Sequence, residues 1–113
     1  MATYDAPLYE EAFAEMEEGL KTVYVLLASD DYMFISSGDR LEFGSYGSIM
    51  VGMVRRYPSL EGLIETEGHR NLVPNAETAE EAVESIRGLG EWDPALEQER
   101  GVIMLRVREA RRK

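Results

Sequence analysis

The stretch over residues 19–27, Gly-Leu-Lys-Thr-Val-Tyr-Val-Leu-Leu, constrains the fold most strongly because it joins a helix to a strand. Ahead of it, Phe13 and Met16 recur at helical spacing among acidic residues, which predicts an amphipathic helix over residues 8–18 that Gly19 ends. The junction holds a lone lysine, Lys21. A helix end that meets a sheet forms a concave wall, so we expect any functional site to lie beside Lys21.

The strand predicted after Lys21 is apolar on both of its faces. Its side chains run Val-Tyr-Val-Leu-Leu over residues 23–27, so that neither alternating set is polar. Continuous apolar runs of this kind are typical of strands that are covered on both sides. We therefore predict a central position in the sheet for residues 23–27.

Four other parts of the chain carry strand patterns. The lead-in before Pro7 fits an edge strand. Residues 40–43 and 48–56 are separated by a turn at residues 44–47, which predicts a hairpin with a bulge at Gly52. Residues 101–108 predict the last strand. Together these short strands predict one curved, mainly antiparallel sheet.

Two further helices are predicted. Leu60 begins a short helix that Gly68 stops. Thr78 and Glu81 form a capping box, which starts the second helix. Residues 90–100 contain Trp92 and are expected to form an irregular connection. Helices packed on a mainly antiparallel sheet place the chain in the α+β class.

Composition restricts the classes of protein and of site. The 113 residues fit a single domain, 1–113. The absence of cysteine excludes disulfides, thiolate metal sites and a cysteine nucleophile, and the one histidine, His69, is expected in a surface loop. No apolar run approaches the ~20 residues that span a bilayer, so we expect a cytoplasmic protein without a membrane partner. A net charge of −10 argues against strong binding to duplex nucleic acid. We expect no cofactor and no metal ion, and the oligomeric state is open.

Several motifs follow one another in the order found in a known family. They are the Gly19-x-Lys21 strand, the Ser37-Gly38-Asp39 turn, the segment Arg55-Arg56-Tyr57-Pro58-Ser59-Leu60, the Leu72-Val73-Pro74 step and the closing Gly101-Val102-Ile103 strand. In this order the chain resembles the ASCH family over nearly its whole length. The resemblance implies a small PUA-like β-barrel of mainly antiparallel strands, with helices packed on it and a cleft beside the Gly-x-Lys strand. Some relatives are thought to bind RNA, whereas others hydrolyse acetylcytidine or cut RNA.

The family pattern at this cleft is roughly Gly-x-Lys-x-x-Glu-x-Arg. Gly19 and Lys21 match the pattern, whereas Tyr24 stands at the glutamate position and Leu26 at the arginine position. In the amidohydrolase relatives, the lysine works with a threonine on the same strand and with a later glutamate. Here Thr22 follows the lysine, and the later glutamate would come from residues 61–67. Because two cleft positions differ, we predict little or no hydrolysis of acetylcytidine.

Two functions remain open. The first is a module that binds RNA, a nucleoside or a nucleotide-type ligand in the cleft through Lys21, Tyr24, Arg55 and Tyr57, with charge from Lys21 and Arg55 and a stacking face from Tyr24. The second is a hydrolase of acetylated cytidine nucleosides, or a ribonuclease, whose degenerate active site uses Lys21 and Thr22. We favour the binding module because it does not need the family glutamate and arginine. A barrel that has lost its cleft function, with Lys21 simply solvated at a helix end, is the third alternative.

Overall fold

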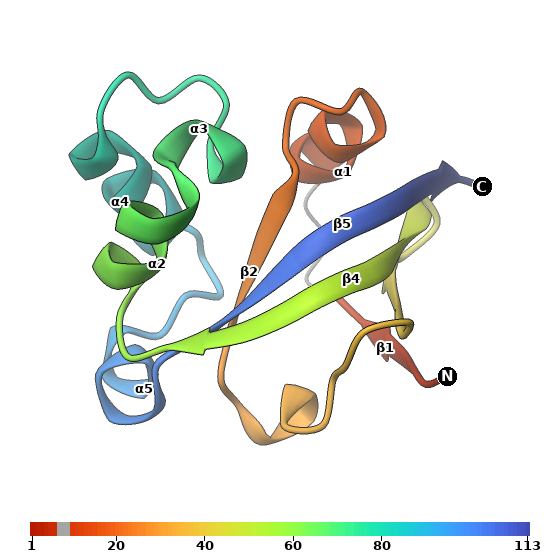
Figure 1. The fold of residues 1–113 in the computed structure, drawn as a ribbon, viewed down its shortest axis with the longest axis horizontal. Helices are drawn as coiled ribbons and strands as arrows, with labels where there is room; N and C mark the ends of the chain where they lie inside the picture. The colour runs from red at the N-terminus through yellow and green to blue at the C-terminus, as the bar shows by residue number, and fades with distance from the viewer. Residues whose placement is uncertain (7–9) are drawn as a thin grey trace.

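The computed structural model, which describes residues 1–6 and 10–113, shows a curled five-stranded sheet with helices packed on it (Figure 1). The strands are β1 (Thr3–Asp5), β2 (Val23–Leu27), β3 (Arg40–Phe43), β4 (Gly47–Tyr57) and β5 (Val102–Arg112). The helices are α1 (Glu10–Glu17), α2 (Leu60–Glu67), α3 (His69–Leu72), α4 (Ala79–Arg87), α5 (Pro94–Arg100) and the short 3-10 helix η1 (Asp30–Tyr32). Within this part of the chain, we find no helix whose length and apolar character would let it cross a membrane.

The strand order in the sheet is β1-β3-β4-β5-β2. The pairings β3–β4, β4–β5 and β5–β2 are antiparallel, while β1 runs parallel to β3. The strands predicted around Val23, Leu41, Val51 and Leu105 therefore share one curved and mainly antiparallel sheet, as expected. Within the described residues the two edge strands, β1 and β2, do not pair with each other, so the sheet is a half-barrel and not the closed barrel that the resemblance implies.

Two compensating irregularities bend the long β4–β5 ribbon. Between Val51 and Val54, β4 has one residue more than its partner strand, and this segment contains Gly52. The register shift between Met50 and Val51 places an extra residue on β5 instead. Because bulges bend a strand and increase its twist, they account for part of the curl of the sheet. The bulge predicted at Gly52 thus corresponds to a register shift in the segment between Val51 and Val54.

The prediction of a central position for β2 is wrong. Among the described strands β2 pairs with β5 alone, and it ends the sheet. Its two apolar faces have a different cause: Tyr24 and Leu26 pack with residues of α1, while Val23 and Val25 pack with residues of α2, α3 and α4. Helical layers therefore bury both faces of an edge strand, a situation that the side-chain pattern cannot distinguish from a central strand.

The sheet divides the apolar core into two layers. One layer contains Phe13 and Met16 of α1 together with Phe43 of β3, and the other contains Leu63 of α2 and Ile86 of α4. Figure 1 shows α2, α3 and α4 gathered on one side of β2, with α1 on the other side. The strand that follows Lys21 thus runs between the two helical layers.

The helix ends follow the local signals in the sequence. Thr78 caps α4 by accepting a hydrogen bond from the main-chain N–H of Glu81 at 3.2 Å, and the Glu81 carboxylate reaches back to the N–H of Glu77 at 3.0 Å. Gly68, at φ +90°, ends α2 as predicted. The helix predicted over residues 8–18 is present as α1 over Glu10–Glu17, and its predicted start at Leu8 lies outside the described residues.

Residues 90–100 are not irregular throughout, because their second part forms α5. The carboxylate of Asp93 accepts hydrogen bonds from the main-chain N–H groups of Ala95 and Leu96 at 3.0 and 3.3 Å, and Pro94 occupies the first helical turn. Asp at the N-cap followed by Pro is a favoured way to start a helix. His69 is likewise part of α3 and not of a loop.

Candidate functional site

Main-chain hydrogen bonds hold Lys21 at the junction of α1 and β2. Gly19 adopts φ +80°, which lets the chain turn out of the helix, and the N–H of Lys21 donates to the carbonyl of Glu15 at 3.1 Å. The next residue, Thr22, donates its N–H to the carbonyl of Asn71 at 3.1 Å. The junction is therefore tied to α1 on one side and to α3 on the other.

The side chain of Lys21 is buried, with 8% of the residue exposed, and its Nζ donates a hydrogen bond to the carbonyl of Leu72. Burial lowers the pKa of Lys21 from 10.5 to about 8, while the nearby Glu15 carboxylate acts in the opposite direction. The Nζ atom also lies 5.7 Å from the centroid of the Tyr24 ring, within the range of a cation–π interaction. A lysine with this pKa changes its charge close to neutral pH, so it can either donate a proton to a ligand or accept one.

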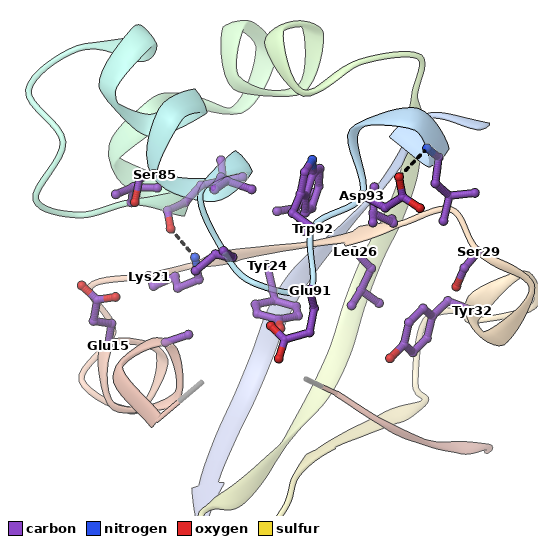
Figure 2. Close-up of a pocket in the computed structure, with 18 residues that line it drawn as sticks. Glu15, Lys21, Tyr24, Leu26, Ser29, Tyr32, Ser85, Glu91, Trp92 and Asp93 are labelled. Atoms are coloured by element: carbon purple, nitrogen blue, oxygen red, sulfur yellow. Dashed lines mark hydrogen bonds between the residues drawn. The ribbon is translucent and has the colours of Figure 1, made fainter. Parts of the chain in front are cut away.

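A cavity of about 720 Å³ opens beside Lys21. Figure 2 shows Lys21 and Glu15 at one end of the cavity and Tyr32 at the other, with Trp92 between them. Its polar lining residues are Glu15, Lys21, Ser29, Ser85, Glu91 and Asp93. Its aromatic lining residues are Tyr24, Tyr32 and Trp92. The cavity thus combines a large apolar and aromatic wall with a few polar groups, as ligand-binding cavities do.

The cavity lies along the edge of β2 and not over one of its faces. Successive residues of a strand point to opposite faces, yet residues 24–27 all line the cavity. The other walls come from α1, α3, α4, α5 and the connection between α4 and α5. Segments that are far apart in the sequence therefore meet at the unpaired edge of the sheet.

Trp92 is a wall residue that the sequence analysis leaves unassigned. Its indole N–H donates to the carboxylate of Glu97 at 3.0 Å, which fixes the orientation of the ring. The signal that could have pointed to it is its position as the sole tryptophan, between the turn-forming residues Gly90 and Pro94. Sequence alone does not indicate that this connection returns to β2.

The carboxylate of Glu97 is the centre of the network that supports Trp92. It accepts hydrogen bonds from Arg87 at 2.9 and 2.6 Å and from the main-chain N–H of Leu60 at 3.1 Å. These bonds, with that to Arg87 as the largest effect, lower the pKa of Glu97 and keep the buried carboxylate ionised. The network joins α2, α4 and α5 behind the cavity wall.

Of the site residues predicted from the sequence, Lys21 and Tyr24 both line the cavity. Thr22 is exposed and is not among the lining residues. Arg55 is exposed on β4, where it pairs with Met104 of β5, and it does not line the cavity either. The structure therefore brings together one of the two predicted cations and the predicted aromatic residue, but not the predicted Lys–Thr pair.

Tyr57, the remaining predicted ligand-binding residue, does not line the cavity and forms its hydrogen bond elsewhere. Its hydroxyl donates to the carboxylate of Glu67 at 3.3 Å, and Glu67 also pairs with Arg106 at 3.1 Å. Glu61 pairs with Arg87 at 2.7 Å. None of the residues in 61–67 lines the cavity, so its carboxylates come from other segments, namely Glu15, Glu91 and Asp93.

The described residues contain no cluster of three or more His, Cys, Asp or Glu side chains that could hold a metal ion. His69 is half-buried, and its Nε2 atom has no hydrogen-bond partner within the described part of the chain. It is not among the residues that line the large cavity. The chemistry available in the cavity is therefore that of a lysine, three carboxylates and hydroxyl groups.

Comparison with known proteins establishes the fold. The crystal structure of the hypothetical protein PH0355 superposes with a TM-score of 0.84 at 26% sequence identity, covering 98% of this chain and 100% of that one. The solution NMR structure of protein PF0455 from Pyrococcus furiosus gives a TM-score of 0.75 at 24% identity, covering 96% of both chains. No protein-family model matches the sequence, and none of the curated proteins does. The half-barrel with its packed helices is thus an arrangement that other chains share over nearly their full length.

Proposed function

We propose that this chain is a binding module for a nucleoside-type ligand, which occupies the cavity at the edge of β2. The observation that carries the proposal is the combination of an aromatic wall, formed by Tyr24, Tyr32 and Trp92, with the buried amine of Lys21 in a cavity of about 720 Å³. Cavities that bind small molecules are roughly 300–1,000 Å³ in volume and are mostly apolar, with a few polar groups that orient the ligand. The size and lining of this cavity suit one base with its sugar.

The charges of the cavity favour a nucleoside over a longer RNA strand. Lys21 is the sole basic residue among the described lining residues, whereas Glu15, Glu91 and Asp93 are acidic. A groove that follows an RNA backbone is normally positively charged, and this chain has a net charge of −10. Electrostatics therefore disfavours phosphates in the cavity, while an uncharged base and ribose avoid this repulsion.

The resemblance to the ASCH family supports the same proposal. Gly19 and Lys21, which carry the family pattern, stand at the junction that forms one end of the cavity. We interpret the half-barrel as a PUA-like barrel that is left open between β1 and β2, and the cavity as the family cleft. In this interpretation Tyr24 and Leu26 replace the charged cleft residues and make the wall more apolar.

A titration followed by amide-resolved NMR tests the proposal. The ligands are cytidine, uridine, adenosine, guanosine and a short single-stranded RNA. We expect the nucleosides to change the amide chemical shifts of Lys21, Tyr24 and Trp92. The Trp92→Leu variant should bind them more weakly than the unsubstituted protein. Arg55→Ala is the matched control, because Arg55 is exposed and outside the cavity lining, so its substitution should leave the affinity unchanged.

Two results would contradict this function. In the first, RNA changes the amide chemical shifts of the exposed arginines of β4 and β5 but of no cavity residue. This result would assign binding to the outer surface of the sheet. Binding that depends on Arg55 more than on Trp92 would do the same. In either case the cavity would have no part in ligand recognition.

A second candidate is a hydrolase of an acylated nucleoside, and the lowered pKa of Lys21 is the observation that favours it. With a pKa of about 8, Lys21 can act as a general base at mildly alkaline pH, and Glu15 and Glu91 line the same cavity. Thr22 does not line the cavity, so this chemistry would rely on Lys21 with one of these carboxylates. The binding module remains the better proposal because it requires no such arrangement.

A further inference from the structure

The unpaired edge of β2 carries main-chain groups that point away from the sheet. In the antiparallel pairing with β5, the carbonyl of Thr22 accepts from Val107 at 3.0 Å, and the N–H of Ala28 donates to the carbonyl of Gly101 at 3.2 Å. The register Tyr24–Leu105 continues the same set, so even-numbered residues of β2 direct their N–H and C=O groups toward β5. Odd-numbered residues must then direct theirs outward.

Val25 is the odd-numbered residue at the middle of the cavity wall. Because residues 24–27 all line the cavity, the cavity faces the edge of the strand, and the N–H and C=O of Val25 open toward it. Within residues 1–6 and 10–113, no strand pairs with this edge. Val25 as a whole is only 9% exposed, and main-chain groups are costly to bury without a partner, so an occupant of the cavity that pairs with its N–H and C=O satisfies one donor and one acceptor.

We propose that the main-chain N–H and C=O of Val25 recognise the hydrogen-bonding edge of a heterocyclic base, an inference that rests on the proposed function and specifies its ligand. Nucleobases carry a hydrogen-bond donor next to an acceptor on one edge of a planar ring. A ring that bonds to Val25 lies roughly in the plane of the sheet, where a further strand would lie. Its two faces then contact the two apolar layers, with Tyr24 and Leu26 on one side and Ile86 on the other.

A base bound beside β2 would explain why helices cover both faces of this edge strand while its edge is left open to a cavity. Open strand edges invite pairing with other chains, and proteins usually cover them or shorten them. Here the helical layers protect both faces, and the base takes the place of the missing strand. The recognition depends on main-chain atoms, so it needs no particular side chain at position 25 and leaves no sequence motif.

The first test uses ligand analogues to measure how much the hydrogen-bonding edge of the base contributes to affinity. Uridine is compared with 3-methyluridine, and cytidine with its N4,N4-dimethyl analogue, because each methylated analogue lacks the donor on that edge. We expect each parent nucleoside to shift the Val25 amide strongly and to bind roughly tenfold to a hundredfold more tightly than its analogue, since a missing partner leaves a buried polar group unsatisfied.

The second test removes the donor from the protein. Val25→Pro deletes the outward N–H without removing a ladder hydrogen bond, and proline is tolerated at such positions of edge strands. Val23→Pro is the matched control, because Val23 is also odd-numbered and also buried, at 2% exposed against 9% for Val25, but does not line the cavity. We expect Val25→Pro to weaken nucleoside binding about tenfold or more and Val23→Pro to leave it within about twofold.

The outcomes separate this inference from the proposed function. In one outcome, nucleosides change the chemical shifts of the Lys21 and Trp92 amides but not of the Val25 amide, and the methylated analogues bind as tightly as the parents. This result would overturn the role of Val25 and keep the cavity as the binding site. Absence of any nucleoside binding would overturn both. If neither proline variant folds, the analogue series and the Val25 amide shift decide the question on the unsubstituted protein.

Discussion

The ammonium group of Lys21 donates a hydrogen bond to the carbonyl of Leu72, 51 positions later in the chain. This contact joins the end of α1 to the end of α3, and Thr22 adds a main-chain bond to Asn71 beside it. The lysine at the junction of helix and strand therefore has a structural partner as well as a place in the cavity wall. Its charge state should affect both the stability of the fold and the binding of ligands.

The stability of the protein relative to its Lys21→Met variant is expected to increase as the pH rises from about 8 to about 10.5. In this window the unfolded lysine, with a pKa of 10.5, still holds its proton, whereas the buried Lys21, with a pKa of about 8, has released it. Stability rises with pH wherever the unfolded state binds more protons. The full change should be roughly 3 kcal/mol, and urea unfolding of both proteins across this range measures it.

Below about pH 8 both states of Lys21 are protonated, so the difference in unfolding free energy between the two proteins should be constant there. The subtraction removes the contribution of other groups that titrate at alkaline pH. If the difference in unfolding free energy between the two proteins does not change between pH 7 and pH 10.5, the buried lysine keeps an ordinary pKa.

Glu97→Ala is expected to destabilise the protein by about 3–5 kcal/mol, because it leaves the partly buried Arg87 without its closest carboxylate and removes the partners of Trp92 and the Leu60 N–H. Glu61→Ala removes the more exposed partner of Arg87 and should cost less than about 1 kcal/mol. Thermal or urea unfolding compares the two variants. Equal effects would mean that the buried network contributes no more than a surface ion pair.

Gly47→Ala is expected to cost about 1–3 kcal/mol. An added Cβ at this position would overlap the carbonyl of Arg111 on β5 and the ring of Phe13, which belongs to α1 and packs against this end of the sheet. Gly90→Ala is the matched control, because nothing lies within 4 Å of its added Cβ. This substitution should change the free energy of unfolding by less than about 0.5 kcal/mol. A Gly47→Ala protein as stable as the control would show that α1 does not pack against β4 as described.

Purified protein is expected to show little or no turnover of acetylcytidine. Loss of one well-placed catalytic group commonly lowers a rate by roughly two to four powers of ten. Tyr24 and Leu26 stand where the pattern of the ASCH family, which the sequence resembles, has two charged residues. The assay compares the protein with Lys21→Ala at pH 7 and pH 9, where Lys21 is mostly protonated and mostly neutral. Turnover at pH 9 that Lys21→Ala abolishes would favour the hydrolase.

Much of the candidate site could not be predicted from the sequence. Lys21 and Tyr24 both line the cavity, and they lie together because they are close to each other along the chain, at a junction whose helix and strand patterns are strong. Trp92 and Glu91 reach the same cavity from a connection about seventy positions later, and the local pattern around them indicates only a turn. Arg55, the second predicted cation, lies on β4 outside the cavity because β5 separates β4 from β2 in the sheet.

The sequence by itself determined the local structure: the helix that ends near Gly19, the cap at Thr78, the end of α2 at Gly68, the irregularity near Gly52 and the alternation of β5 side chains between the two core layers. These features depend on main-chain conformation, on hydrogen bonds between neighbours and on the direction of each side chain. The tertiary structure decided that β2 is an edge strand, that helices cover both of its faces, and that its outward main-chain groups border a cavity. The reason is physical: an apolar pattern reports which faces of a strand are buried, whereas the pairing of its edges depends on segments that are remote in the chain.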